Sequence, residues 1–166
     1  MTRFGLISIL MVFISVYGFG QSNKNKGLRS ELIGGWEFSE LRDDKGNKVD
    51  TIWHNVPGLG KKGWEIPRGP LMVYNANGTY SKQFTPKNID TGEWYYDEKK
   101  KEINQTLSYP KPYSAAAQYL IDKGHAKQDR NGSYYEVIID KIVELTNDTL
   151  IILEREGRQR IFIKKK

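Results

Sequence analysis

Apolar residues occur along the chain in short continuous or alternating runs, and turn-forming residues separate these runs. From Leu32 onward the breaks come about every eight to twelve residues, the spacing typical of antiparallel β-sandwiches and β-barrels. Helical periodicity is scarce. The pattern predicts strands over the ranges 36–41, 49–54, 70–74, 79–84, 91–96, 102–107, 134–145, 149–155 and 158–164.

Turn signals and one helical segment complete the predicted topology. Asn77-Gly78 supplies the positive φ that a tight hairpin needs. Residues 114–123 are predicted to form a helix, with Ser114 as the N-cap and Gly124 as the stop. Consecutive antiparallel strands form a sandwich or close on themselves, and closure removes exposed edges. We therefore predict an all-β fold, an up-and-down antiparallel barrel of about eight strands with one helical insertion, whose interior holds side chains or one small ligand.

The stretch 57–69 is the longest predicted loop. It contains four glycines, two prolines and Trp64, and loops of about thirteen residues in a compact domain are often functional.

Two Gly-x-Trp triplets, Gly34-Gly35-Trp36 and Gly92-Glu93-Trp94, resemble the signature of lipocalins. The segment 142–161 is also similar to the closing hairpins of short lipocalin-like domains in exported bacterial proteins. The resemblance covers about Leu32 to Ile163 and implies a lipocalin-type barrel. It also implies that the signature Trp packs at the closed end beneath an Arg of the last strand. The barrel-closure residues implied in this way are Gly34, Trp36, Arg158 and Arg160. Lipocalins usually place their helix after the eighth strand, whereas here it interrupts the middle of the chain.

The first twenty residues are predicted to be a signal peptide. Arg3 precedes an apolar run over residues 4–16, and Gly18-Phe19-Gly20 forms a small-x-small cleavage pattern before Gln21. An uncleaved membrane anchor is the alternative, but the run is shorter than the ~20 residues that span a bilayer. We expect an exported protein, periplasmic or extracellular, with no stable membrane span after cleavage. Its mature part would comprise a flexible lead, 21–31, and a barrel domain, 32–166.

Composition narrows the chemistry. The chain contains no Cys, which excludes disulfides, thiol nucleophiles and Cys-ligated metals. Its net charge of +6 falls to about +5 without Arg3, and part of the excess lies at Lys24, Lys26 and the three C-terminal lysines. These clusters lack the interleaved aromatic residues of a nucleic-acid platform, so no nucleic-acid partner is expected.

Catalytic and metal-binding motifs are lacking in the sequence. His54 and His125 are far apart and are predicted to be surface or loop residues. The Gly-x-Gly-x-x-Gly pattern of residues 58–63 neither ends a clear strand nor opens a helix, as dinucleotide binding requires. We predict no catalytic residue, no metal site and no cofactor, and an enzymatic function stays open only in the general sense that barrels can host one.

Alternation places Lys82, Gln105 and Lys141 on predicted apolar faces. In a closed barrel such side chains need partners, because a buried unpaired charge is costly. In one interpretation, aromatic residues form a pocket in which Lys82 or Lys141 fixes an anionic or polar ligand group. In the other, a bulge or register shift turns each lysine to solvent. The candidate ligand-binding residues are Tyr80, Lys82, Phe84, Tyr96, Tyr135 and Lys141.

Two binding functions follow from these patterns. The leading hypothesis is an exported, non-enzymatic, lipocalin-like protein that holds a small apolar or amphipathic molecule inside the barrel. The alternative is surface recognition of carbohydrate or a cell-envelope polymer, with Trp53 and Trp64 as stacking platforms on or near the long loop.

Overall fold

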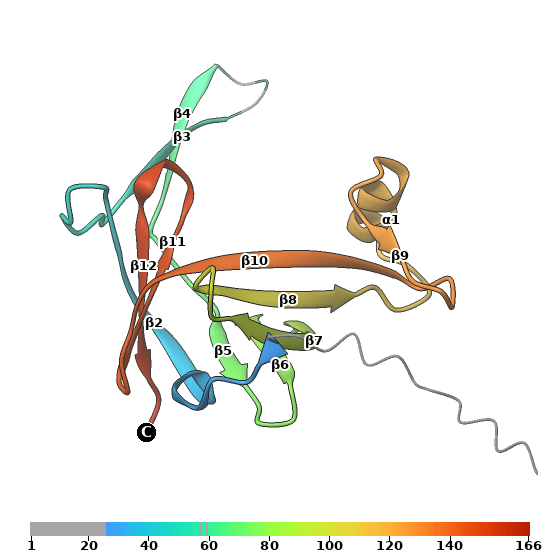
Figure 1. The fold of residues 1–166 in the computed structure, drawn as a ribbon. Helices are drawn as coiled ribbons and strands as arrows, with labels where there is room; N and C mark the ends of the chain where they lie inside the picture. The colour runs from blue at the N-terminus through green and yellow to red at the C-terminus, as the bar shows by residue number, and fades with distance from the viewer. Residues whose placement is uncertain (1–25, 57, 59) are drawn as a thin grey trace, which may run out of the picture.

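The structure is a computed structural model and describes residues 26–56, 58 and 60–166. The predicted signal peptide, 1–20, lies outside the described residues. Eight antiparallel strands form a barrel in which each strand pairs with the next along the chain (Figure 1). The eight are β2 (Gly34–Arg42), β5 (Leu71–Tyr74), β6 (Thr79–Thr85), β7 (Asn88–Asp97), β8 (Glu102–Ser108), β10 (Tyr134–Leu145), β11 (Thr149–Leu153) and β12 (Gln159–Lys164). The pairing of β12 with β2 closes the barrel, so the predicted up-and-down topology is confirmed.

The barrel interior is packed with large side chains toward one end. Trp36, Tyr74, Leu32 and Ile103 are fully buried there. We call this the closed end. The opposite end, where the short 3-10 turn η2 (Arg155–Gly157) joins β11 to β12, is the open end.

A lysine, rather than an arginine, covers the signature Trp at the closed end. The Nζ of Lys164 lies 5.0 Å from the ring centroid of Trp36 and donates a 2.7 Å hydrogen bond to the Glu31 carbonyl. The indole of Trp36 donates to the Leu32 carbonyl at 2.8 Å. The implied role of Arg158 or Arg160 above Trp36 is therefore wrong, because Lys164 is the β12 residue paired with Trp36.

Gly34 fits the closure role that was expected of it. Its backbone has φ = 122°, in the left-handed half of the map that favours glycine. A Cβ at this position would also lie 3.1 Å from Cε of Lys164. A side chain here would therefore disturb the lysine that covers Trp36.

The helix lies where the sequence predicts it. α1 (Ala115–Asp122) begins after Ser114, whose hydroxyl accepts a 3.2 Å hydrogen bond from the Ala117 amide. It ends before Gly124, whose φ is 72°. The two-residue strand β9 (Lys127–Gln128) then pairs with β10, and α1 and β9 lie beside the far end of β8 and β10 (Figure 1). No helix among the described residues has the length and apolar character needed to cross a membrane.

The predicted loop 57–69 is wrong in part, because it contains a strand. β3 (Ile52–Val56) and β4 (Lys61–Glu65) form an antiparallel hairpin that projects away from the barrel (Figure 1). Trp53 lies opposite Trp64, and the two side chains are 64% and 61% exposed. The glycines and lysines of this segment conceal the strand, because they give no apolar alternation.

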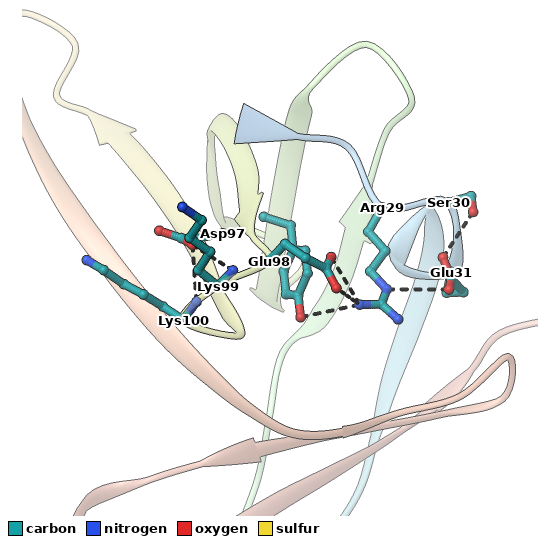
Figure 2. A network of polar contacts seen from close by, with 8 residues as sticks. Arg29, Ser30, Glu31, Asp97, Glu98, Lys99 and Lys100 are labelled. Carbon is teal, nitrogen blue, oxygen red and sulfur yellow. Dashed lines mark hydrogen bonds and ion pairs between the residues drawn. The ribbon is translucent and has the colours of Figure 1, made fainter. Parts of the chain in front are cut away.

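The residues just before the barrel belong to its closed end. β1 (Lys26–Gly27) pairs with β7, and η1 (Ser30–Leu32) places Leu32 in the core. Arg29 reaches Glu31 and, at 3.1 Å, Glu98 (Figure 2). Its guanidinium also lies 5.3 Å from the ring centroid of Tyr96. Within the predicted flexible lead, residues 26–31 are therefore attached to the barrel, because a strand pairing and an arginine network hold them.

Candidate functional site

A half-enclosed cavity of about 400 Å³ occupies the open end of the barrel. Five of the eight barrel strands, or the segments next to them, contribute to its wall. The apolar part of the wall consists of Pro70, Met72, Phe84, Ile152, Leu153 and Phe162. The polar part consists of Lys82, Asp140, Glu154, Arg155, Arg158 and Arg160.

One lysine of the wall is neutralised inside the barrel. Lys82 of β6 forms an ion pair of 3.1 Å with Asp140 of β10, and both side chains are largely buried. The Gln105 amide, on β8, donates a 2.5 Å hydrogen bond to the same carboxylate oxygen. Asp140 therefore satisfies two inward-facing donors from two other strands.

The arginines of the wall differ in how well they are paired. Arg160 of β12 contacts Glu154, the residue that follows β11, in a close ion pair of 2.6 Å. Arg158 reaches the exposed carboxylate of Glu156 only at 3.6 Å, and its buried Nε has no hydrogen-bond partner among the described residues. The Arg155 side chain is exposed and forms no ion pair or hydrogen bond with the described residues.

Buried tyrosines lie in the interior beside the ion pair. Burial, together with the neighbouring carboxylates Asp90 and Asp140, raises the pKa of Tyr80 to about 12. The Tyr80 hydroxyl and Gln105 Oε1 are buried, and neither has a hydrogen-bond partner among the described residues. Burial also raises the pKa of Tyr74 well above its usual range. The barrel interior thus holds unpaired polar atoms close to a satisfied ion pair.

A second hollow of about 420 Å³ lies under α1, beside β7 and β8. Ile89, Leu107 and Leu120 contribute apolar wall, and the Tyr109 hydroxyl donates a 2.7 Å hydrogen bond to Glu136 there. Burial and this hydrogen bond raise the pKa of Tyr109. The helix thus covers part of the flank of the barrel.

No protein-family model and no curated protein matches the chain. Among solved structures, the chain is similar to a lipocalin-like protein from Bacteroides uniformis ATCC 8492, with 16% identity and a TM-score of 0.45 over 81% of this chain and 99% of that one. It is also similar to an uncharacterized protein from Bacteroides eggerthii DSM 20697, with 17% identity and a TM-score of 0.45 over the same shares. The fold assignment depends on the strand order of the closed barrel itself. The fold is lipocalin-like.

The lipocalin-like barrel brings two of the six predicted ligand-binding residues to its cavity. Lys82 and Phe84 both line the wall. Tyr80 points inward on the same strand and is buried. Tyr96 is also buried, but at the closed end beside Arg29.

The other two predicted residues lie on the outer face of the lipocalin-like barrel. Lys141 is exposed, and its neighbours Ile139 and Val143 are 56% and 47% exposed. Tyr135 lies six residues before Lys141 on β10, and the pairing of β10 with β8 has no register shift between these two positions. Side chains alternate along a strand, so Tyr135 faces the same side as Lys141 and away from Asp140. Of the two interpretations of Lys141, the one that turns it to solvent holds and the one that makes it a ligand contact inside the barrel is wrong, because Asp140 and Ile142 occupy the inner positions.

Sequence reasoning missed Asp140 as a wall residue and assigned Arg158 and Arg160 to the wrong end. β10 carries apolar residues at both parities, so alternation does not indicate which face is buried. The position of the two arginines could have been found by counting along β12. Its last residue, Lys164, pairs with Trp36, so Arg158 and Arg160 lie toward the opposite end of the strand. The two histidines are exposed, and no group of metal-binding side chains occurs in the described ranges.

Proposed function

We propose that the barrel binds a small amphipathic molecule in its open end, without catalysing a reaction. The cavity of about 400 Å³ carries this proposal, because binding sites for small molecules are concave, largely apolar and supplied with a few placed polar groups. Met72 and Phe162 offer apolar surface from two strands, and the arginines lie at the rim beside η2.

The pairing of the charged groups supports binding rather than chemistry. Lys82 is paired with Asp140 and Arg160 with Glu154. A general base or nucleophile needs a free group with a matched partner within hydrogen-bond reach. The carboxylates of this wall are instead committed to cations.

Titration with the uncharged dye N-phenyl-1-naphthylamine tests the proposal. We expect a saturable fluorescence increase that Phe84→Ala weakens about fivefold, since losing about 1 kcal/mol of apolar contact has that effect. The matched control is Val143→Ala, because Phe84 and Val143 are similarly exposed, at 49% and 47%, but Val143 lies on the outer face. If the dye does not bind, or if both variants weaken its binding equally, the barrel interior is not the binding site.

Recognition of a carbohydrate or a cell-envelope polymer is the second candidate function. The cross-strand pair of Trp53 and Trp64 favours it, because both rings are mostly exposed on a projecting hairpin. Exposed aromatic faces can stack on the apolar faces of sugar rings. A glycan array probed with the wild type and Trp64→Ala distinguishes this function, and equal binding by the two proteins would exclude the hairpin as the site.

We also propose that the chain is exported, from the basic, apolar and small-residue pattern of its first twenty residues. The test is N-terminal sequencing of the protein recovered from its own cells. A chain beginning at Gln21 is the expected result, and an intact Met1 would contradict cleavage.

A further inference from the structure

We propose that the open end is a receptor for an anionic headgroup and that Arg158 is its principal contact. The inference rests on the proposed function and adds the chemical class of the ligand: an apolar body that carries a carboxylate, sulfate, sulfonate or phosphate. It assigns to Arg158 a role different from barrel closure. It also transfers the anion contact from Lys82, where the sequence suggested it, to the rim.

The charges of the wall leave a positive surplus. Four cations, Lys82, Arg155, Arg158 and Arg160, line the cavity together with two carboxylates, Asp140 and Glu154. Lys82 uses Asp140, and Arg160 uses Glu154. Of the two remaining arginines, Arg155 begins η2 and Arg158 directly follows it, so the charge that no wall carboxylate neutralises is concentrated at one side of the mouth.

Arg158 also has an unused donor that solvent does not reach. Its Nε is buried and without a hydrogen-bond partner among the described residues, while its Nη2 lies 3.6 Å from the mostly exposed Glu156. A buried donor without an acceptor costs free energy, and native proteins nearly always satisfy such groups. Once a small rotation of the Arg158 side chain exposes Nε, an oxyanion at the mouth would accept from Nε and from a second guanidinium nitrogen, in the two-pronged geometry that arginine favours.

The turn holds Arg158 at a fixed place on the rim. The Glu154 amide donates a 2.7 Å hydrogen bond to the Arg158 carbonyl, and the Arg158 amide donates a 3.4 Å hydrogen bond to the Arg155 carbonyl. Glu156 has φ = 62° and Gly157 has φ = 75°, which lets the chain reverse within this short segment. Arg155 and Arg158 therefore flank one tight turn, and both reach the cavity.

The apolar wall lies next to this surplus. Ile152 is inward-facing on β11, two residues before Glu154, and Phe162 is inward-facing on β12, two residues after Arg160. Met72 adds wall from β5. A ligand with its anionic group at Arg158 would therefore place its apolar body against these side chains. Its charge would stay at the rim and would not be buried unpaired inside the barrel.

Two dyes with nearly the same apolar body test the inference on the full chain. They are 1-anilinonaphthalene-8-sulfonate and N-phenyl-1-naphthylamine, which lacks the sulfonate. We expect the sulfonate to bind more tightly, and we expect Arg158→Gln to weaken its binding about tenfold, the effect of losing a charge-assisted hydrogen bond. The affinity for the uncharged dye should change less than about twofold, which is well below the change expected from losing one charge-assisted hydrogen bond.

Control variants distinguish a direct contact of Arg158 with the anion from an effect of the protein's net charge. Lys141→Gln removes the same charge from the outer face, and it should leave the binding of both dyes unchanged. Arg158→Lys keeps the charge but loses the planar donor pair, so it should restore only part of the sulfonate affinity. Near-ultraviolet circular dichroism of each variant verifies that the core is folded, and Arg155→Gln provides a second, exposed test at the same rim if Arg158→Gln fails to fold.

The outcomes distinguish this inference from the proposed function. If the two dyes bind equally and Arg158→Gln changes neither, the anion receptor is wrong and the barrel function stands. If neither dye binds, the proposed function itself is wrong. Competition of bound sulfonate dye by decanoate, decyl sulfate or decyl phosphate then shows which anion is preferred, and failure of all three alongside displacement by decanol would overturn the inference.

Discussion

Lys82 and Asp140 form an ion pair of 3.1 Å across the barrel interior, although 58 residues separate them along the chain. Their strands, β6 and β10, are not neighbours in the sheet. The pair therefore connects two parts of the barrel wall through the interior. It also neutralises the only lysine of the cavity wall among the described residues, which leaves anion recognition to the arginines.

Substituting Lys82→Met should destabilise the barrel. The Asp140 carboxylate would keep only the Gln105 amide as a neighbouring donor in a largely buried position. We expect the free energy of unfolding to fall by about 1–3 kcal/mol, measured by urea denaturation. Lys141→Met on the exposed face should change it by less than about 0.5 kcal/mol, and equal losses in the two variants would show that the ion pair has no special role.

Gly92→Ala should disrupt the packing between β7 and β8. A Cβ at Gly92 would lie 1.9 Å from the Thr106 carbonyl oxygen and 3.0 Å from Cε1 of Tyr80. Because backbone must shift to accommodate it, we expect a loss of about 3 kcal/mol or more in the free energy of unfolding. Gly27→Ala is the control, since a Cβ there meets nothing within 4 Å, and a thermal melt of both variants measures the difference.

Alkaline pH should destabilise the fold through its buried tyrosines. The pKa of Tyr80 rises from 10.0 to about 12 in the folded protein. A raised pKa in the folded state means that folding favours the neutral form of Tyr80. Its contribution to the free energy of unfolding is therefore fully present below pH 10. It is lost as pH rises from about 10 to about 12, because the unfolded tyrosine ionises first.

Tyr80→Phe isolates this contribution. Since the hydroxyl has no partner among the described residues, removing it should leave stability at pH 7 unchanged or raise it by up to about 1 kcal/mol. The decline in stability above pH 10 should become shallower, although Tyr74 and Tyr109, whose pKa values are also raised, still contribute to it. Denaturant titrations at a series of pH values measure the slope, and an unchanged slope would contradict the assignment.

Lys164→Met should weaken the closed end. The substitution removes the cation 5.0 Å from the Trp36 ring centroid and the 2.7 Å hydrogen bond to the Glu31 carbonyl. A loss of about 1–2 kcal/mol in the free energy of unfolding is expected. Lys165→Met serves as the control, because its 3.9 Å contact to Glu37 is exposed and such pairs contribute little.

The order of elements could be predicted from the sequence because its signals are local. Asn77-Gly78 marks a hairpin, and Gly78 has φ = 83°. Ser114 marks the start of the helix, because its hydroxyl caps the first turn, and Gly124 marks the end, because its backbone adopts a positive φ. Up-and-down closure then follows from many short strands with short connections.

The site could be predicted only in part, because facing and register depend on the whole barrel. Lys82 and Phe84 alternate clearly on β6, and both reach the cavity. The orientation of Lys141 stays open at the level of sequence, because β10 has apolar residues on both faces, some of them exposed, and a shift of one residue exchanges the faces. The partnership of Lys82 with Asp140 is a long-range contact that no local pattern contains.

A ¹H–¹⁵N correlation spectrum recorded during titration with 1-anilinonaphthalene-8-sulfonate tests the central claim most directly. The account predicts that the largest shift changes occur at the open end, in Lys82, Arg158 and Arg160 and the residues beside them, and that Arg158→Gln reduces them. Changes confined to the β3–β4 hairpin or to the outer face around Lys141 would contradict binding inside the barrel.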